Sequence, residues 1–395
     1  MMNFKPPQAM IGSHSWPILG LGFRPFYILA ALWAVVAIPL WLGMLYGQVN
    51  LPSALPGYLW HAHEMIFGFA VAVIMGFLLT AVRNWTGLAT PTGWPLAGLA
   101  MLWLIGRLVN LGAPLSVAAI VDLLFLPTGA LMLARPLGAS QQRRNYFVPV
   151  LLLALALMDA WFYREVALGE SVQRPLMAAL GLIITLVTVI AGRVIPMFTR
   201  NMAKSTQQYR WPWLENLIVP LTLLTFAGMI FWPQAWMTMV LASLAAVLHG
   251  LRAWGWDPRA SKSYPMLWIL HIAYAWIVVG FAGAALSSLG YLSIVVVTHL
   301  FALGAMVSMM MGMMTRTALG HTGRPLVAHY PETLMYALMP VALLMRIAAS
   351  IIHPWSQVTP LWLIGSGGAW TLAFCIYLWR YGPWLLSRRV DGMPG

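Results

Sequence analysis

Long apolar runs alternate with short polar segments along the whole chain. Each run approaches or exceeds the roughly 20 residues that an α-helix needs to cross a bilayer. The alternating pattern of a membrane β-barrel is absent. We therefore predict an all-α polytopic membrane protein with twelve transmembrane helices, at residues 22–45, 58–82, 94–111, 114–134, 146–163, 175–198, 211–231, 233–254, 265–286, 289–315, 331–352 and 360–380.

Composition supports this fold and excludes a soluble domain, since 61% of the 395 residues are hydrophobic and only 8% are charged. The net charge of +13 would suit a nucleic-acid partner, but the basic residues stand in short loops between apolar runs. We expect a lipid bilayer partner and no nucleic acid. Cys375 is the only cysteine, which excludes an internal disulfide and a covalently attached c-type haem. The first twenty residues lack the apolar core of a cleavable signal peptide.

The distribution of basic residues predicts the orientation in the membrane. Of the 22 Lys and Arg residues, 18 lie towards the side that holds the N-terminus, and the remaining four are Arg107, Arg164, Arg174 and Arg346. Cytoplasmic loops carry an excess of Lys and Arg. We therefore expect both termini in the cytoplasm.

A weak internal repeat runs through this pattern. Arg83, Arg200 and Arg316 end the second, sixth and tenth predicted spans, at separations of 117 and 116 residues. Three four-helix units near 22–134, 146–254 and 265–380, within a single membrane domain, would explain the spacing. The alternative is that every cytoplasmic helix end has this composition.

The second span begins with a polar cluster formed by His61, His63 and Glu64. Polar groups at the mouth of a membrane helix are costly and indicate function. His299, in the tenth span, lies in the same outer half of the membrane, about two turns deeper. His61 and His63 are roughly 200° apart on a helix, so they do not face one centre if both are helical.

We favour haem or metal ligation for these three histidines. Depth favours His63 and His299 as the haem ligands. His61, on the same helix face as Glu64, would then hold copper or relay protons at the outer mouth. The simpler alternative is that His61 caps the helix or meets lipid headgroups.

A second group of polar residues lies at the cytoplasmic level. His271 stands near the start of the ninth span, where ligation and packing are both open. His321 and Arg324 lie in the loop Gly-His-Thr-Gly-Arg, which suits an anion or haem propionate as well as a plain loop. Lone histidines in membrane helices often bond a neighbouring helix, which we expect of those near interfaces: His249, His329 and His353. His14 is left undecided.

Two further features of the spans have ordinary structural explanations. Arg107 and Asp122 lie towards the outer half of the third and fourth spans, and pairing would reduce the cost of burying each. The tenth span is rich in methionines, whose thioethers suit Cu(I) but also fill helix interfaces well. We favour packing for most of them: Met306, Met309, Met310, Met311, Met313 and Met314.

Over nearly its whole length the chain resembles the NnrS proteins of denitrifying and related bacteria. The resemblance rests on several motifs in the same order: residues 22–26, 61–87, 192–196 with 198–201, 267–271 with 274–276, and 298–299 leading to 320–324. One departure is Arg83, where the family usually has proline. His61, His63, His271, His299 and His321 fall on matching motif positions.

The resemblance implies a bacterial inner-membrane protein that contains non-covalent, b-type haem and copper. It also implies a role in nitric oxide metabolism or nitrosative-stress resistance, with nitric oxide as ligand, an electron donor as partner, and oxidoreductase activity left open. The alternative is a transporter or channel for a metal or small molecule. Transporters place their sites near the midplane, whereas the histidines here cluster at two interfacial levels, which favours the redox protein.

Overall fold

The computed structural model describes residues 16–204, 206–351 and 359–393, and within these ranges the chain forms helices and no strand. The helices are α1 (Phe23–Leu45), α2 (Gly57–His63), α3 (Val71–Thr86), α4 (Gly93–Val109), α5 (Leu115–Leu123), α6 (Phe125–Ala139), α7 (Phe147–Leu168), α8 (Gln173–Met202), α9 (Pro212–Phe231), α10 (Trp236–Gly255), α11 (Pro265–Ser288), α12 (Ile294–His299), α13 (Ser308–His321), α14 (Tyr330–Ile351) and α15 (Thr359–Leu386). Short 3₁₀ turns occur at Pro17–Leu19, Arg143–Asn145 and Pro258–Ser261.

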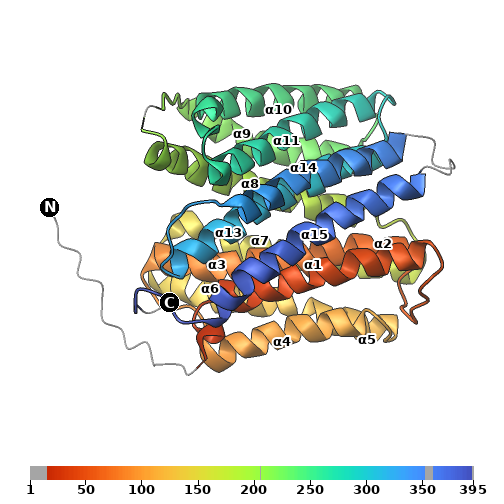
Figure 1. Cartoon of the computed structure of the whole chain (residues 1–395). Helices are drawn as coiled ribbons and strands as arrows, with labels where there is room; N and C mark the ends of the chain where they lie inside the picture. The colour runs from red at the N-terminus through yellow and green to blue at the C-terminus, as the bar shows by residue number, and fades with distance from the viewer. Residues whose placement is uncertain (1–15, 205, 352–358, 394–395) are drawn as a thin grey trace.

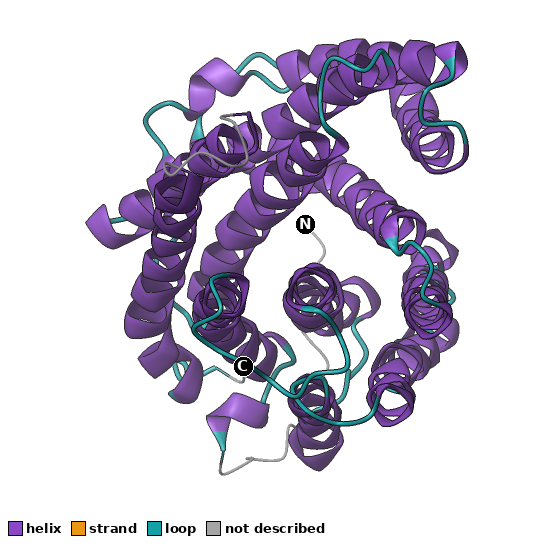
Figure 2. Cartoon of the chain, turned by 90° about the vertical axis from the view of Figure 1, so that its right-hand side faces the viewer, coloured by secondary structure: helices purple, strands orange, loops and turns teal. Residues whose placement is uncertain are grey.

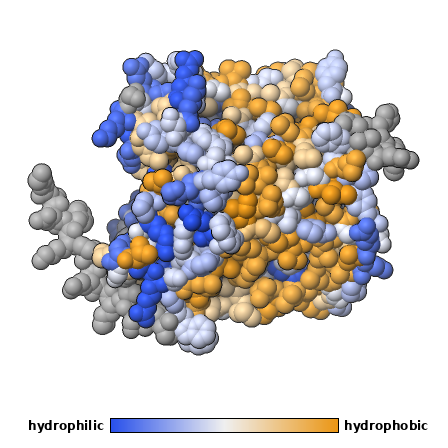
Figure 3. All heavy atoms as spheres, in the orientation of Figure 1, coloured by the Kyte–Doolittle hydropathy of each residue, from blue (hydrophilic) through white to orange (hydrophobic). Residues whose placement is uncertain are grey.

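These helices confirm an all-α polytopic membrane fold. Eleven described helices are long and apolar enough to cross a bilayer, and α4 is a shorter apolar helix. Each of the twelve predicted spans coincides with one of these helices, with ends that differ by a few residues. The second, fourth and tenth spans are composite, at Gly57–Thr86, Leu115–Ala139 and Ile294–His321. An apolar band covers the middle of the molecule, and hydrophilic residues gather towards its ends (Figure 3).

Several helix ends have a local cause in the sequence. Pro212 and Pro265 occupy first helical positions, where the missing N–H is not needed. Gly87 and Gly169 follow the last residues of α3 and α7 with φ of 70°, a left-handed conformation that costs glycine little.

The helices lie side by side as a bundle (Figure 1), and Figure 2 shows the same bundle end on. The three most buried spans are Gly57–Thr86, Gln173–Met202 and Ile294–His321, which are the second, sixth and tenth. They stand at equivalent places in the three predicted four-helix units. The boundaries of those units stay a prediction.

Two of these inner spans contain a π-helical segment directly after a histidine. Glu64–Ala70 follows His63, and Leu300–Val307 follows His299. π-helical turns are rare and are frequent at functional sites. Both segments lie where the candidate site is built.

Candidate functional site

A cavity of about 730 Å³ lies between the helical span that carries His61 and the span that carries His299. Helices α1, α8, α14 and α15 complete its wall. His61, His299 and Arg346 all line it. The apolar part of the wall includes Met65, Phe69, Leu180, Leu303, Met306 and Trp370. A concave apolar site with a few convergent polar groups is typical of a cofactor or ligand pocket.

His299 is held in one orientation by its own helix. Its Nδ1 lies 2.7 Å from the carbonyl oxygen of Val295, so Nδ1 carries the proton and donates it there. The lone pair then resides on Nε2, the nitrogen that a metal would take. A bond of this kind to the far nitrogen is the usual support of a metal-ligating histidine.

His61 is held differently. Its ring stacks on Trp41 of α1, with ring centroids 4.0 Å apart and an interplanar angle of 21°. Its Nδ1 is buried and has no hydrogen-bond partner among the described residues. His61 is therefore positioned by ring stacking alone, without a bond that fixes which nitrogen is protonated.

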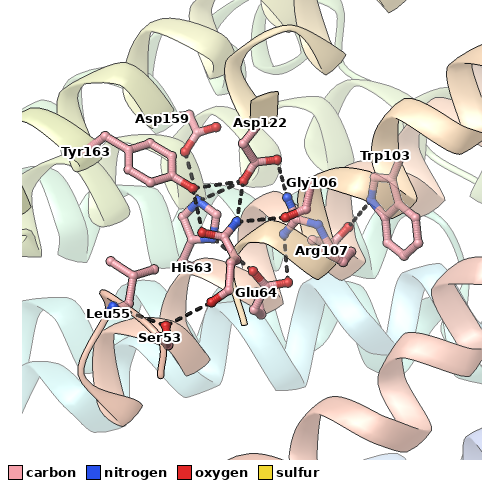
Figure 4. A network of polar contacts seen from close by, with 12 residues as sticks. Ser53, Leu55, His63, Glu64, Trp103, Gly106, Arg107, Asp122, Asp159 and Tyr163 are labelled. Carbon is pink, nitrogen blue, oxygen red and sulfur yellow. Dashed lines mark hydrogen bonds and ion pairs between the residues drawn. The ribbon is translucent and has the colours of Figure 1, made fainter. Parts of the chain in front are cut away.

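His63 lies in a separate buried network on another side of the same helix (Figure 4). Its Nδ1 is 3.2 Å from Oε1 of Glu64, and its Nε2 is 3.0 Å from Oδ1 of Asp159 and 3.4 Å from Oδ2 of Asp122. Arg107 donates to Oε2 of Glu64 at 2.7 Å and also pairs with Asp122. The predicted pairing of Arg107 with Asp122 is thus confirmed.

Asn110 and Tyr163 close this network. The Asn110 amide and the Tyr163 hydroxyl both donate to Oδ2 of Asp122, at 2.9 and 3.1 Å. With the three carboxyl groups ionised, both ring nitrogens of His63 must carry protons, because an ionised carboxylate only accepts. The network then combines three negative charges with two positive ones, which offsets much of the cost of burying them in a membrane.

Two glycines make room for this network. A Cβ at Gly68 would stand 2.7 Å from Oε2 of Glu64 and 2.9 Å from Nη1 of Arg107. A Cβ at Gly106 would stand 2.9 Å from Oδ1 of Asp122. The charged groups approach these helices at backbone distance, which only glycine permits.

The structure brings together only some of the residues that the sequence singled out. His61 and His299 share the cavity, whereas His63 and Glu64 belong to the ion network and are absent from the cavity wall. Both oxygens of Glu64 bond His63 and Arg107, and no contact joins them to His61 among the described residues. The predicted ligand roles of His63 and Glu64 stay predictions.

The residues that the sequence analysis assigned to the cytoplasmic level contact protein groups away from the cavity. Nε2 of His271 is 3.0 Å from the Thr199 hydroxyl. Nε2 of His321 is 3.5 Å from the Asn84 amide. The Arg324 guanidinium lies over the ring of Trp384, 4.6 Å from its centroid. Whether His271, His321 and Arg324 contact a cofactor stays a prediction.

The expected structural role of His249 is confirmed. Its Nδ1 lies 2.8 Å from the Tyr274 hydroxyl and its Nε2 lies 3.0 Å from the Thr222 hydroxyl, so both nitrogens bond neighbouring helices. His329 is exposed at the start of α14. His14 and His353 lie outside the described residues.

Sequence reasoning missed several residues of these two sites, among them Asn110 in the ion network. Asp159 is the lone carboxylate in the apolar part of the fifth span, and Tyr163 follows it one turn later. That spacing was a usable signal, because an intramembrane acid needs a partner. Arg346 carried the same signal. Trp41 carried none, since tryptophans are common throughout this chain.

Comparison with known proteins gives one match and one absence. The curated proteins include none that matches this chain. The model of the NnrS protein family matches residues 17–389, nearly the whole sequence. The chain therefore belongs to the NnrS family.

Proposed function

We propose that this protein holds a non-covalent, b-type haem between His61 and His299 and binds or converts nitric oxide there. At the family level, NnrS membership makes it a nitric-oxide-related membrane protein, and the family binds haem and copper in general. One observation carries the proposal: two histidines from two different helices line a single cavity. This proposal replaces His63 by His61 as the partner of His299.

The cavity suits the group in size and chemistry. Bis-histidine ligation needs no covalent thioether, which agrees with a chain that has a single cysteine. The polar residues of the wall come from the outer ends of their helices, while Phe69, Met306 and Trp370 lie deeper. A haem is amphiphilic in the same sense, with polar propionates on one edge of an apolar ring.

The two histidines would have different tasks. When bound, the haem would supply a redox-active iron that can bind nitric oxide. His299 is fixed through Val295 and suits the permanent ligand. His61 has no such bond and is held by stacking on Trp41, so it suits the ligand that leaves.

Copper fits the ion network poorly. Donor atoms of His63, Asp122 and Asp159 lie within 4.8 Å of one another, and imidazole with carboxylates suits Cu(II). However, both nitrogens of His63 already bond carboxylates, and Arg107 shares Asp122. The donor atoms of the network are therefore already engaged with protein groups.

Within the cavity, Met65 and Met306 stand with His61 and His299, a set of soft donors that suits Cu(I). Copper there would compete with haem for the same histidines. Iron and copper should therefore be measured together in the purified protein.

The absorption spectrum of the purified protein tests the proposal. We expect a Soret band, a pyridine haemochrome spectrum of b type, and a shift of the Soret band when the reduced protein meets nitric oxide. A Soret band that does not respond would refute the direct role of nitric oxide. Absence of any Soret band after haem supplementation would favour the alternative, a transporter or channel for a metal or small molecule.

We further propose the bacterial inner membrane as its location, with both termini in the cytoplasm. The basic loops support this orientation. It places the opening of the cavity on the outer side.

A further inference from the structure

Arg346 is a charged residue in the wall of an otherwise mostly apolar cavity. It lies near the outer end of α14, and α14 packs against α12, the helix that carries His299. Its Nε is buried without a hydrogen-bond partner among the described residues. Its Nη1 donates to the neutral hydroxyl of Ser350 at 2.5 Å.

No carboxylate side chain of the chain pairs with Arg346. All nine Asp and Glu residues lie in the described ranges, so residues 352–358 cannot supply an acid. None of the nine forms an ion pair with Arg346. Glu170, the one acid in the cavity wall, is exposed at its rim.

Two other arginines of the chain pair with carboxylates, a third bonds backbone carbonyls, and buried Arg316 lies over the ring of Phe198. Arg107 pairs with Glu64 and Asp122, and Arg252 pairs with Glu215 at 2.5 Å. Arg24 donates to three backbone carbonyls at the end of α15. Arg346 is partly buried within an apolar helix, where a guanidinium without a counter-charge is costly. Because it lines the cavity, the missing negative charge points to a ligand there.

Nitric oxide does not meet this need, because it is neutral. A carboxylate does, since it accepts two parallel N–H bonds from a guanidinium. We infer that Arg346 anchors a carboxylate of the cavity ligand, namely a haem propionate. The inference rests on the proposed function. It implies that the propionate edge of the haem faces the outer side of the membrane.

A comparison of haem with its dimethyl ester tests this anchor, because the ester keeps the ring and iron but removes both negative charges. The full-length apoprotein in nanodiscs of neutral lipid is titrated with each compound, followed by the Soret band. We expect wild type to bind haem at least about tenfold more tightly than the ester, the range of a charge-assisted hydrogen bond. Arg346→Gln should bring the two affinities close to equal, and Arg346→Lys should restore part of the preference.

The design contains its own controls. Equal ester binding by wild type and Arg346→Gln shows that the variant is folded. Arg324→Gln, which removes the arginine that the sequence favoured for this contact, should keep the wild-type preference. In Arg346→Gln the reduction potential should fall, because an unpaired propionate charge favours ferric iron.

Three outcomes would overturn the inference. A preference for haem that survives in Arg346→Gln removes Arg346 as the anchor, while the proposed function stands. If Arg324→Gln, and not Arg346→Gln, loses the preference for haem over the ester, the propionate lies at the cytoplasmic level near Arg324. If Arg346→Gln changes only the retention of anionic lipid, its partner is a lipid phosphate. Failure of wild type to bind either compound would refute the proposed function itself.

Discussion

His61 and His63 stand two residues apart on α2 and face different surroundings: the ring of His61 stacks on Trp41 beside the cavity, and the ring of His63 bonds Glu64 and Asp159 in the ion network. Under the proposed function, this divergence separates a ligand-binding residue from a structural one within a single turn. Substitutions of the two histidines should therefore have different effects.

Alanine variants of the three outer histidines should behave in two ways. His61→Ala and His299→Ala should lose the bis-histidine haem spectrum, because each would remove one of the two proposed haem ligands. His63→Ala should keep that spectrum while lowering thermal stability, because it leaves Asp159 without its partner. Haem content measures the first effect, and the melting temperature in detergent measures the second. Loss of haem in His63→Ala alone would restore the ligand pair that the sequence favoured.

Breaking the ion network should be costly. Arg107→Leu leaves Glu64 and Asp122 buried without their cation, and we expect a loss of about 3–5 kcal/mol in the free energy of unfolding. Arg164→Gln is the matched control, since Arg164 pairs with Glu165 at 2.5 Å but is 65% exposed. That change should cost at most about 1 kcal/mol. Equal costs for the two variants would contradict a stabilising role for the network.

Gly68→Ala tests how closely the network packs against its helix. The added Cβ would meet Glu64 and Arg107 at under 3 Å, and we expect a destabilisation of about 1–3 kcal/mol. Gly98→Ala in α4 is the control, because its Cβ would meet nothing within 4 Å. Alanine has the higher helix propensity, so this control should be neutral or slightly stabilising. The melting temperatures of the two variants should move apart.

Cysteine labelling tests the orientation. Cys375 is exposed and is first replaced by alanine. Ala54→Cys then probes the exposed loop before α2, and Gln207→Cys probes the exposed loop before α9. A membrane-impermeant maleimide should label Ala54→Cys in intact spheroplasts and Gln207→Cys only in inverted vesicles. The reverse pattern would invert the topology and move the cavity opening to the cytoplasm.

The spans could be predicted from the sequence because their length and apolar character follow from the bilayer alone. The pairing of Arg107 with Asp122 could be predicted for a similar reason, since burial leaves few partners. Which of His61 and His63 lines the cavity could not be predicted. Helical spacing gives the angle between two side chains, but it does not tell which of them faces the cavity. That choice depends on Trp41 and Asp159, which lie on other helices, α1 and α7.

The π-helical segments carry a geometric consequence for the angular register of their helices. A π turn closes with an i→i+5 bond, one residue more than an α turn. Side chains before Glu64–Ala70 and Leu300–Val307 are therefore rotated relative to those after them, and a regular helical wheel through either span misplaces one half. Because the π turn holds one extra residue, deleting a single residue from Glu64–Ala70 would leave an unbroken α-helix and keep His61 directed towards the cavity. Such a protein would keep its fold and its hydropathy profile, and it should keep its haem absorbance as well.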